Sequence, residues 1–108
     1  MRTIKEYILE NYDEEEMKDI CKHGCVSGCA SGLIYYHETV KFHDEYEKEI
    51  WDMLFDDAQD QDMTILELIA SFNGKKDVYD IEQFKNLLCW YAIEKVCFGI
   101  VNEREEAA

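Results

Sequence analysis

LLCWYAIEKVCFGIV, residues 87–101, is the most apolar stretch of the chain and decides which kind of fold it can adopt. Twelve of these fifteen residues are apolar, and on a helix they lie on every side instead of along one stripe. A helix of this composition is surrounded by other helices. The stretch is too short to span a bilayer, and it carries Glu94 and Lys95. It therefore predicts the central helix of a bundle, with contacts to neighbouring helices from Leu88, Trp90, Tyr91, Ile93, Val96, Cys97 and Ile100.

Helix-capping patterns define the other helices. Four residue pairs have the spacing in which two side chains satisfy free N–H groups at a helix start: Thr3 with Glu6, Asp13 with Glu16, Thr64 with Glu67, and Asp80 with Gln83. Helices are expected over residues 4–11, from 13 to about 24, over 39–59, 64–72 and 81–102. The second of these either ends near Gly24 or continues toward Tyr36. We therefore expect an all-α fold, a single domain over residues 1–108. It should be a compact bundle of five or six helices around a hydrophobic C-terminal helix, with a frayed tail over 103–108.

The composition is strongly acidic, with 25 acidic and 11 basic side chains and a net charge of −14. Nucleic acids and anionic membranes repel such a chain, so neither is expected as a direct partner, whereas basic proteins are attracted. The N-terminal residues are charged and lack the apolar run of a secretory signal. The five cysteines are an odd number, which is typical of reduced thiols. We expect a cytoplasmic protein.

Residues 44–62 carry nine acidic side chains and one lysine. At about 100° per residue, the apolar side chains of this region form one stripe that should face the core, made of Phe42, Tyr46, Ile50, Met53 and Leu54. The acidic side chains form a separate row, and two aromatic residues share a third face. The predicted partner-binding surface consists of this acidic row, Glu45, Glu49, Asp52 and Asp56, and the aromatic anchors Trp51 and Phe55.

The spacing of these charges suggests a kind of partner. Nineteen helical residues span about 28 Å, so the nine charges follow one another at about 3 Å. The charges of one DNA strand are about 3.4 Å apart, so a rigid acidic helix could occupy the nucleic-acid groove of a basic protein. Lys41 and Lys48 can relieve Glu45 and Asp52 but leave most of the row uncompensated. The alternative is a solvated helix face that binds nothing.

Small residues dominate CKHGCVSGCASG, residues 21–32. On a helix, Gly24, Gly28 and Gly32 form a row that another helix can approach closely, within the chain or in a homodimer. Each glycine inside a helix costs about 0.5–1 kcal/mol, so a packing role is favoured. The alternative is a metal or thiol site made of Cys21, His23, Cys25 and Cys29, although structural zinc sites usually combine two ligand pairs across a longer loop. No catalytic residue and no cofactor is expected, because no phosphate-loop, metalloprotease or nucleophile-elbow pattern occurs.

Two stretches, residues 23–54 and FKNLLCWYAIEKV at 84–96, resemble small acidic proteins encoded by phages and mobile elements. The resemblance carries over neither an assigned activity nor catalytic residues. By analogy it implies an inhibitor of a host nucleic-acid-binding defence complex, of the anti-restriction or anti-CRISPR kind, because small acidic phage proteins often imitate nucleic acid or cover its binding site. The leading hypothesis is therefore a non-enzymatic acidic interaction protein with a basic partner. The alternatives are the metal or thiol protein and the homo-oligomer.

Overall fold

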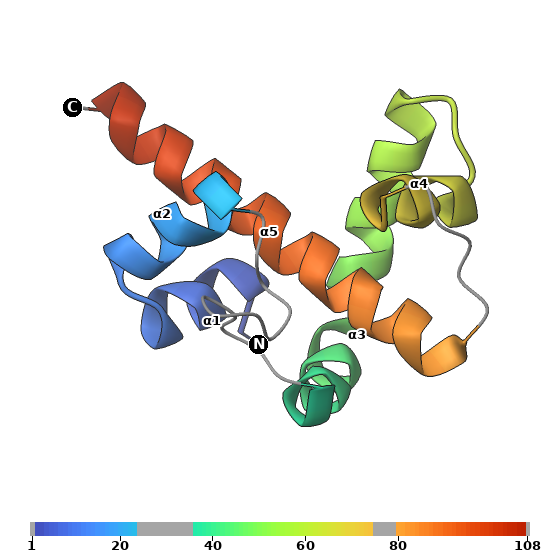
Figure 1. Cartoon of the computed structure of the whole chain (residues 1–108). Coiled ribbons are helices and arrows are strands. Elements are labelled where there is room, and N and C mark those ends of the chain that lie inside the picture. Colours follow the sequence, from blue (N-terminus) through green and yellow to red (C-terminus); the bar gives the residue numbers. More distant parts are fainter. Residues whose placement is uncertain (1, 24–35, 75–79, 108) are drawn as a thin grey trace.

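Five helices make up the described part of the chain, and the last of them crosses the whole molecule. A computed structural model describes residues 2–23, 36–74 and 80–107. In chain order the helices are α1 (Ile4–Asn11), α2 (Glu14–His23), α3 (Tyr36–Asp60), α4 (Ile65–Phe72) and α5 (Ile81–Ala107). α5 runs diagonally, with α1 and α2 along the half that leads to the C-terminus and α4 near its start (Figure 1). The radius of gyration is 13.5 Å, close to the roughly 13 Å of a compact chain of this size. The predicted all-α bundle is confirmed.

The helices begin where the capping patterns predict. Thr3 Oγ1 accepts a hydrogen bond at 3.2 Å from the backbone N–H three residues further on, which opens α1. Asp13 and Glu16 each accept a hydrogen bond from the backbone N–H of the other, at 2.8 and 3.0 Å, and α2 follows. Thr64 and Glu67 do the same at 3.1 and 3.2 Å before α4. Because these N–H groups have no partner within their own helix, the side chains determine where each helix starts.

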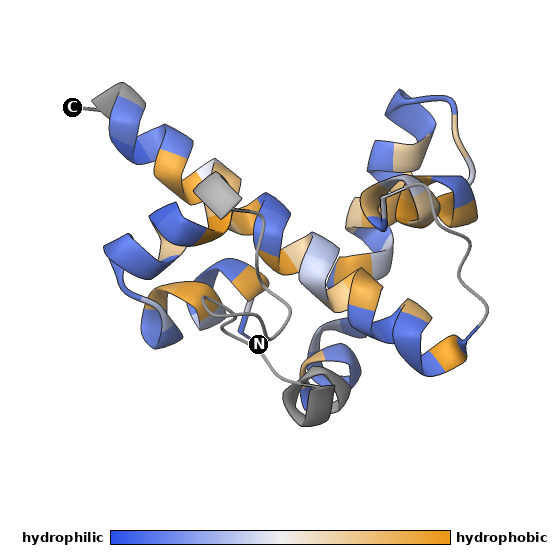
Figure 2. Ribbon diagram, in the orientation of Figure 1, coloured by the Kyte–Doolittle hydropathy of each residue, from blue (hydrophilic) through white to orange (hydrophobic). Residues whose placement is uncertain are grey.

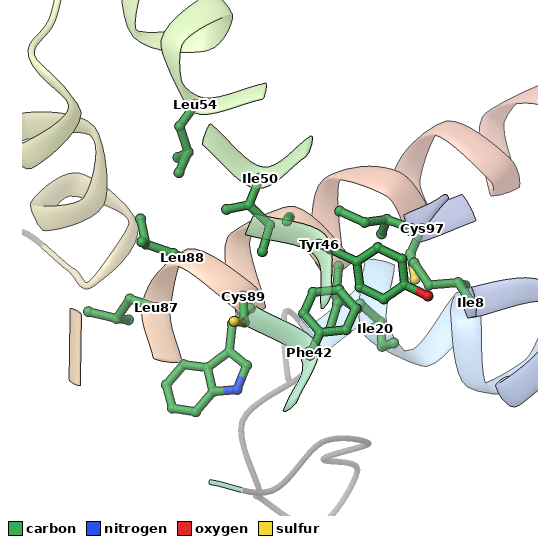
Figure 3. Packing of buried hydrophobic residues seen from close by; sticks show 14 of the residues in the cluster. Ile8, Ile20, Phe42, Tyr46, Ile50, Leu54, Leu87, Leu88, Cys89 and Cys97 are labelled. Carbon is green, nitrogen blue, oxygen red and sulfur yellow. The ribbon is translucent and has the colours of Figure 1, made fainter. Parts of the chain in front are cut away.

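α5 is the centre of the core, as its composition predicts. It packs against each of the other four helices. The residues expected to touch neighbours are all buried or packed against the core, and five α5 side chains are completely inaccessible: Leu88, Cys89, Ala92, Ile93 and Cys97. Apolar residues concentrate along the middle of this helix, whereas its last turns are hydrophilic (Figure 2). Figure 3 shows the packing around it, with Ile8 of α1, Ile20 of α2 and Ile50 and Leu54 of α3.

α3 is longer than expected and is bent at Tyr46, where the backbone has φ −113° and ψ 17°. The segments before and after the bend run in different directions (Figure 1). Before the bend, the Phe42 ring lies 5.1 Å from the ring of Tyr7 in α1. After the bend, the Glu49 side chain also contacts α1, and α3 as a whole packs on α4 and α5. No glycine or proline occurs at this point, so the sequence contains no local helix breaker that would account for the bend.

The sequence predicts the end of the last helix near 102 and a frayed tail over 103–108, whereas α5 continues to Ala107. The segment EREEA contains good helix formers and no glycine or proline, so nothing ends the helix earlier. Glu103 also accepts a hydrogen bond at 3.1 Å from Lys5 of α1. None of the helices in the described ranges has the length and apolar character needed to cross a membrane.

Candidate functional site

Most of the predicted acidic row faces solvent. Glu45, Asp52 and Asp56 are exposed, and none of them forms a salt bridge within the part of the chain that the structure describes. Asp60, which lies four residues beyond Asp56 on the same face, is exposed as well. The expected relief by Lys41 and Lys48 is therefore not formed as ion pairs. We call Asp52, Asp56 and Asp60, which follow the bend in α3, the acidic strip.

The acidic strip runs to the end of α3 where negative charge is least favourable. The C-terminus of a helix carries a partial negative charge from its free carbonyl groups. The last turn of α3 contains no basic residue, and it contains Asp60. Asp60 should therefore reduce the stability of α3, and no salt bridge within the described residues compensates it. This end of α3 would therefore attract an external cation, whereas its acidic side chains do not stabilise the fold.

Glu49 does not belong to this solvent-facing surface, contrary to the prediction. Its side chain is half-buried, and Oε1 accepts a hydrogen bond at 3.0 Å from the backbone N–H of Ile4. Ile4 is the first residue of α1, so the Glu49 carboxylate satisfies one of the free N–H groups there. The negative charge of this carboxylate also interacts favourably with the partial positive charge at the N-terminus of α1. The packing of α1 beside α3 thus removes Glu49 from the predicted acidic row.

The two predicted aromatic anchors differ from each other. Phe55 is 61% exposed, as expected of an anchor. Trp51 is half-buried and packs against the core. Its ring lies 6.4 Å from the ring of Phe84 in α5, and 6.3 Å from that of Phe55. The prediction that Trp51 points away from the core is wrong, because α5 approaches the third face of α3.

Asp57 is a site residue that the sequence analysis did not single out. It is only 8% exposed, and its carboxylate forms an ion pair with Lys95 and accepts a 2.6 Å hydrogen bond from the Tyr91 hydroxyl. Burial and this hydrogen bond raise the pKa of Tyr91, so its phenol stays protonated. On a helical wheel Asp57 falls about 60° from Leu54, inside the apolar stripe, and that signal could have identified it. The three residues join α3 to α5.

A pocket of about 320 Å³ opens beside this ion pair, between α3, α4 and α5. Its wall is formed by Asp57, Gln61, Phe72, Tyr91, Glu94, Lys95 and Phe98. Glu94 is half-buried, and burial raises the pKa of its carboxyl. Within the described ranges it forms neither a hydrogen bond nor an ion pair. We call this cavity the α3–α5 pocket.

The small-residue stretch is only partly described. Gly24, Gly28, Gly32, Cys25 and Cys29 lie outside the described residues, and His23 is the last residue of α2. Cys21 is half-buried, and burial together with Glu94 and Glu105 raises the pKa of its thiol. The described residues contain no group of three or more side chains placed to hold a metal ion.

The other two described cysteines are buried on α5. Burial raises the pKa of both the Cys89 and the Cys97 thiol to about 12, so neither forms a thiolate at neutral pH. A nucleophilic cysteine needs the thiolate. Cys89 and Cys97 are therefore small apolar components of the core.

Comparison with known proteins identifies a family. A family model described as a domain of unknown function, DUF7222, matches residues 1–106. Neither a curated protein nor a solved structure matches the chain. The family model spans α1 to α4 and all of α5 except its last residue. The chain therefore belongs to the DUF7222 family.

Proposed function

We propose that this protein is a non-enzymatic, cytoplasmic interaction protein that binds a basic protein surface through the acidic strip, with Phe55 as an apolar anchor. The observation that carries the proposal is the placement of Asp52, Asp56 and Asp60. All three are exposed, Asp60 lies in the unfavourable last turn of α3, and none of the three forms a salt bridge within the described residues. A basic partner would relieve this repulsion on binding.

The partner class that we propose is a nucleic-acid-binding protein of a host defence complex, which the resemblance to phage and mobile-element proteins implies. Such a protein has a groove lined by lysine and arginine. This groove attracts the negative charges of an acidic helix, as it attracts the phosphates of nucleic acid. Inhibition would follow because the groove is then closed to nucleic acid. Glu45, exposed on the segment before the bend, would extend the contact.

The spacing of the charges in the acidic strip favours one of two binding modes. The strip would cover the groove of the partner and would not imitate a nucleic-acid strand charge by charge. With Glu49 and Asp57 engaged inside the molecule, the acidic strip has one charge every four residues. That is about 6 Å along the helix axis, nearly twice the roughly 3.4 Å of one DNA strand. The strip therefore supplies fewer charges than the sequence count suggests, and the anchor Phe55 contributes the apolar part of the contact.

The test is affinity capture from host lysate at low and high salt, with three forms of the full chain. They are the wild type, the strip variant Asp52→Lys/Asp56→Lys, and the control variant Asp19→Lys/Glu105→Lys. Asp19 and Glu105 are exposed on α2 and α5, so the control has the same net charge as the strip variant. We expect a basic protein that the wild type and the control retain at low salt, and that the strip variant and high salt release.

The captured protein is then purified and its binding to duplex DNA and to single-stranded RNA is measured. We expect the wild-type chain to displace one of these nucleic acids, and the strip variant to do so at least about tenfold less well, a difference of about 1.4 kcal/mol. If the strip and control variants lose binding equally, net charge and not the acidic strip is responsible. Partner binding without displacement of nucleic acid would refute the proposed inhibition.

A further inference from the structure

The α3–α5 pocket lies where three helices meet, and it is distinct from the acidic strip. α3 and the turn after it contribute Asp57 and Gln61, α4 contributes Phe72, and α5 contributes the other wall residues. Its volume of about 320 Å³ is at the lower end of the range of small-molecule sites. The walls combine three aromatic side chains with a few polar groups, which is the usual composition of a ligand pocket.

The charges in the wall leave one carboxylate without a counter-ion. Lys95 is neutralised by Asp57, which also accepts the Tyr91 hydrogen bond. Glu94 has no hydrogen bond or ion pair in the described residues, so the wall as a whole carries one negative charge. Burial removes part of the water around the Glu94 carboxylate, which raises its pKa. A cation placed beside Glu94 would offset this loss of hydration.

The aromatic walls provide a surface for an apolar body next to that carboxylate. The Phe72 and Tyr91 rings meet edge to face, with centroids 5.3 Å apart and an angle of 80°. Phe98 is 40% exposed at the same pocket, although it is a large apolar residue on the central helix. Aromatic faces attract organic cations as well as apolar groups.

We propose that the α3–α5 pocket binds a small organic cation, with its ammonium or guanidinium group beside Glu94 and its apolar body against Phe72, Tyr91 and Phe98. The cation is either a free amine or a basic side chain of a protein. The net charge of −14 raises the local concentration of any such cation. This inference does not depend on the acidic strip and remains open to test if the proposed function fails.

The experiment is an NMR titration of the isotope-labelled full chain with three probes. Phenethylamine tests a free aromatic amine, arginine amide tests a basic side chain, and N-acetylphenethylamine is a neutral control of similar shape. We expect saturable shifts of the amide signals of Tyr91, Glu94, Lys95 and Phe98 with at least one cation, and none with the neutral control. Saturation by phenethylamine alone assigns a free amine as the occupant, and saturation by arginine amide alone assigns a basic side chain.

Two matched variants separate the pocket from general attraction by an acidic protein. Glu94→Gln should weaken cation binding at least about tenfold, about 1.4 kcal/mol. It should also keep the folded NMR spectrum, because it removes only a charge. Asp19→Asn removes one exposed charge on α2, outside the pocket, and should leave the affinity within about twofold. Equal weakening by both variants, saturation by the neutral control, or no saturation by either cation would overturn the proposal.

Discussion

Asp56 and Asp57 are neighbours on α3 but have opposite surroundings. Asp56 is exposed in the acidic strip, whereas Asp57 is 8% exposed and bound to Lys95 and Tyr91 of α5. One step along a helix turns the side chain by about 100°, which is enough to move a carboxylate from solvent into the apolar stripe. The acidic composition of this chain is therefore divided between two roles, and the count of carboxylates in the sequence overstates the charge available to a partner.

The largest effect should separate these two neighbours. Asp57→Ala leaves the Tyr91 hydroxyl and the Lys95 ammonium without their common acceptor and should reduce the free energy of unfolding by about 1–3 kcal/mol. The lower part of that range allows for Lys95, which is 45% exposed and can turn toward water. Asp56→Ala should change the same quantity by no more than about 0.5 kcal/mol. Denaturation with urea measures both, and equal values would remove the distinction between the two aspartates.

The same contrast exists within the predicted acidic row. Glu49→Ala removes the acceptor for the Ile4 N–H at the start of α1 and should cost about 0.5–2 kcal/mol, the range of lost helix caps. Its partner in the comparison is Glu45→Ala, because Glu45 is exposed and forms no salt bridge in the described residues. Urea denaturation should show almost no change for that variant. A Glu49→Ala chain as stable as wild type would mean that Glu49 belongs to the binding surface after all.

The strip itself should weaken the fold slightly. Asp60 lies in the last turn of α3, at the negative end of the helix. Asp60→Asn should therefore raise the free energy of unfolding by about 0.3–1 kcal/mol at low ionic strength, and the gain should shrink as salt is added. Thermal unfolding at two salt concentrations is the measurement. A loss of stability on this substitution would indicate that Asp60 has a structural contact like that of Asp57.

The smallest expected effect concerns Glu94 and depends on pH. Burial raises its pKa in the folded protein above that in the unfolded chain. The folded state thus binds the Glu94 proton more tightly than the unfolded chain does. The contribution of this proton to the free energy of unfolding is complete at low pH and is lost as pH rises through the folded pKa. Glu94→Gln cannot ionise and should be the more stable form at neutral pH, with a difference in melting temperature that narrows on acidification. The opposite slope would show that the Glu94 carboxylate is stabilised by a counter-ion.

The parts of the fold that depend on local chemistry could be predicted from the sequence. The capping pairs at Thr3, Asp13 and Thr64 act within three residues, and the apolar composition of 87–101 requires neighbours whatever their identity. The bend at Tyr46 could not be predicted, because neither glycine nor proline marks it in the sequence.

In the candidate site, too, the features set by local sequence could be predicted, and the features set by contacts between distant residues could not. The wheel places Asp52 and Asp56 on the outside of α3, which is confirmed. It cannot reveal that α1 begins beside Glu49, or that α5 covers Trp51, because those contacts join residues more than thirty positions apart. Asp57 is the intermediate case, because its position in the apolar stripe is visible in the sequence, but its partners Tyr91 and Lys95 are not.

The most direct measurement is the affinity of a fluorescent arginine homopeptide for four forms of the chain, set beside their free energies of unfolding. The forms are the wild type, Asp52→Lys/Asp56→Lys, the charge-matched Asp19→Lys/Glu105→Lys, and Asp57→Asn. We predict that the strip variant loses affinity by at least about tenfold more than the charge-matched variant and keeps its stability. Asp57→Asn should lose stability and keep its affinity. Equal affinities for the two lysine variants, or a strip variant that unfolds as readily as Asp57→Asn, would contradict the division of these carboxylates between fold and partner.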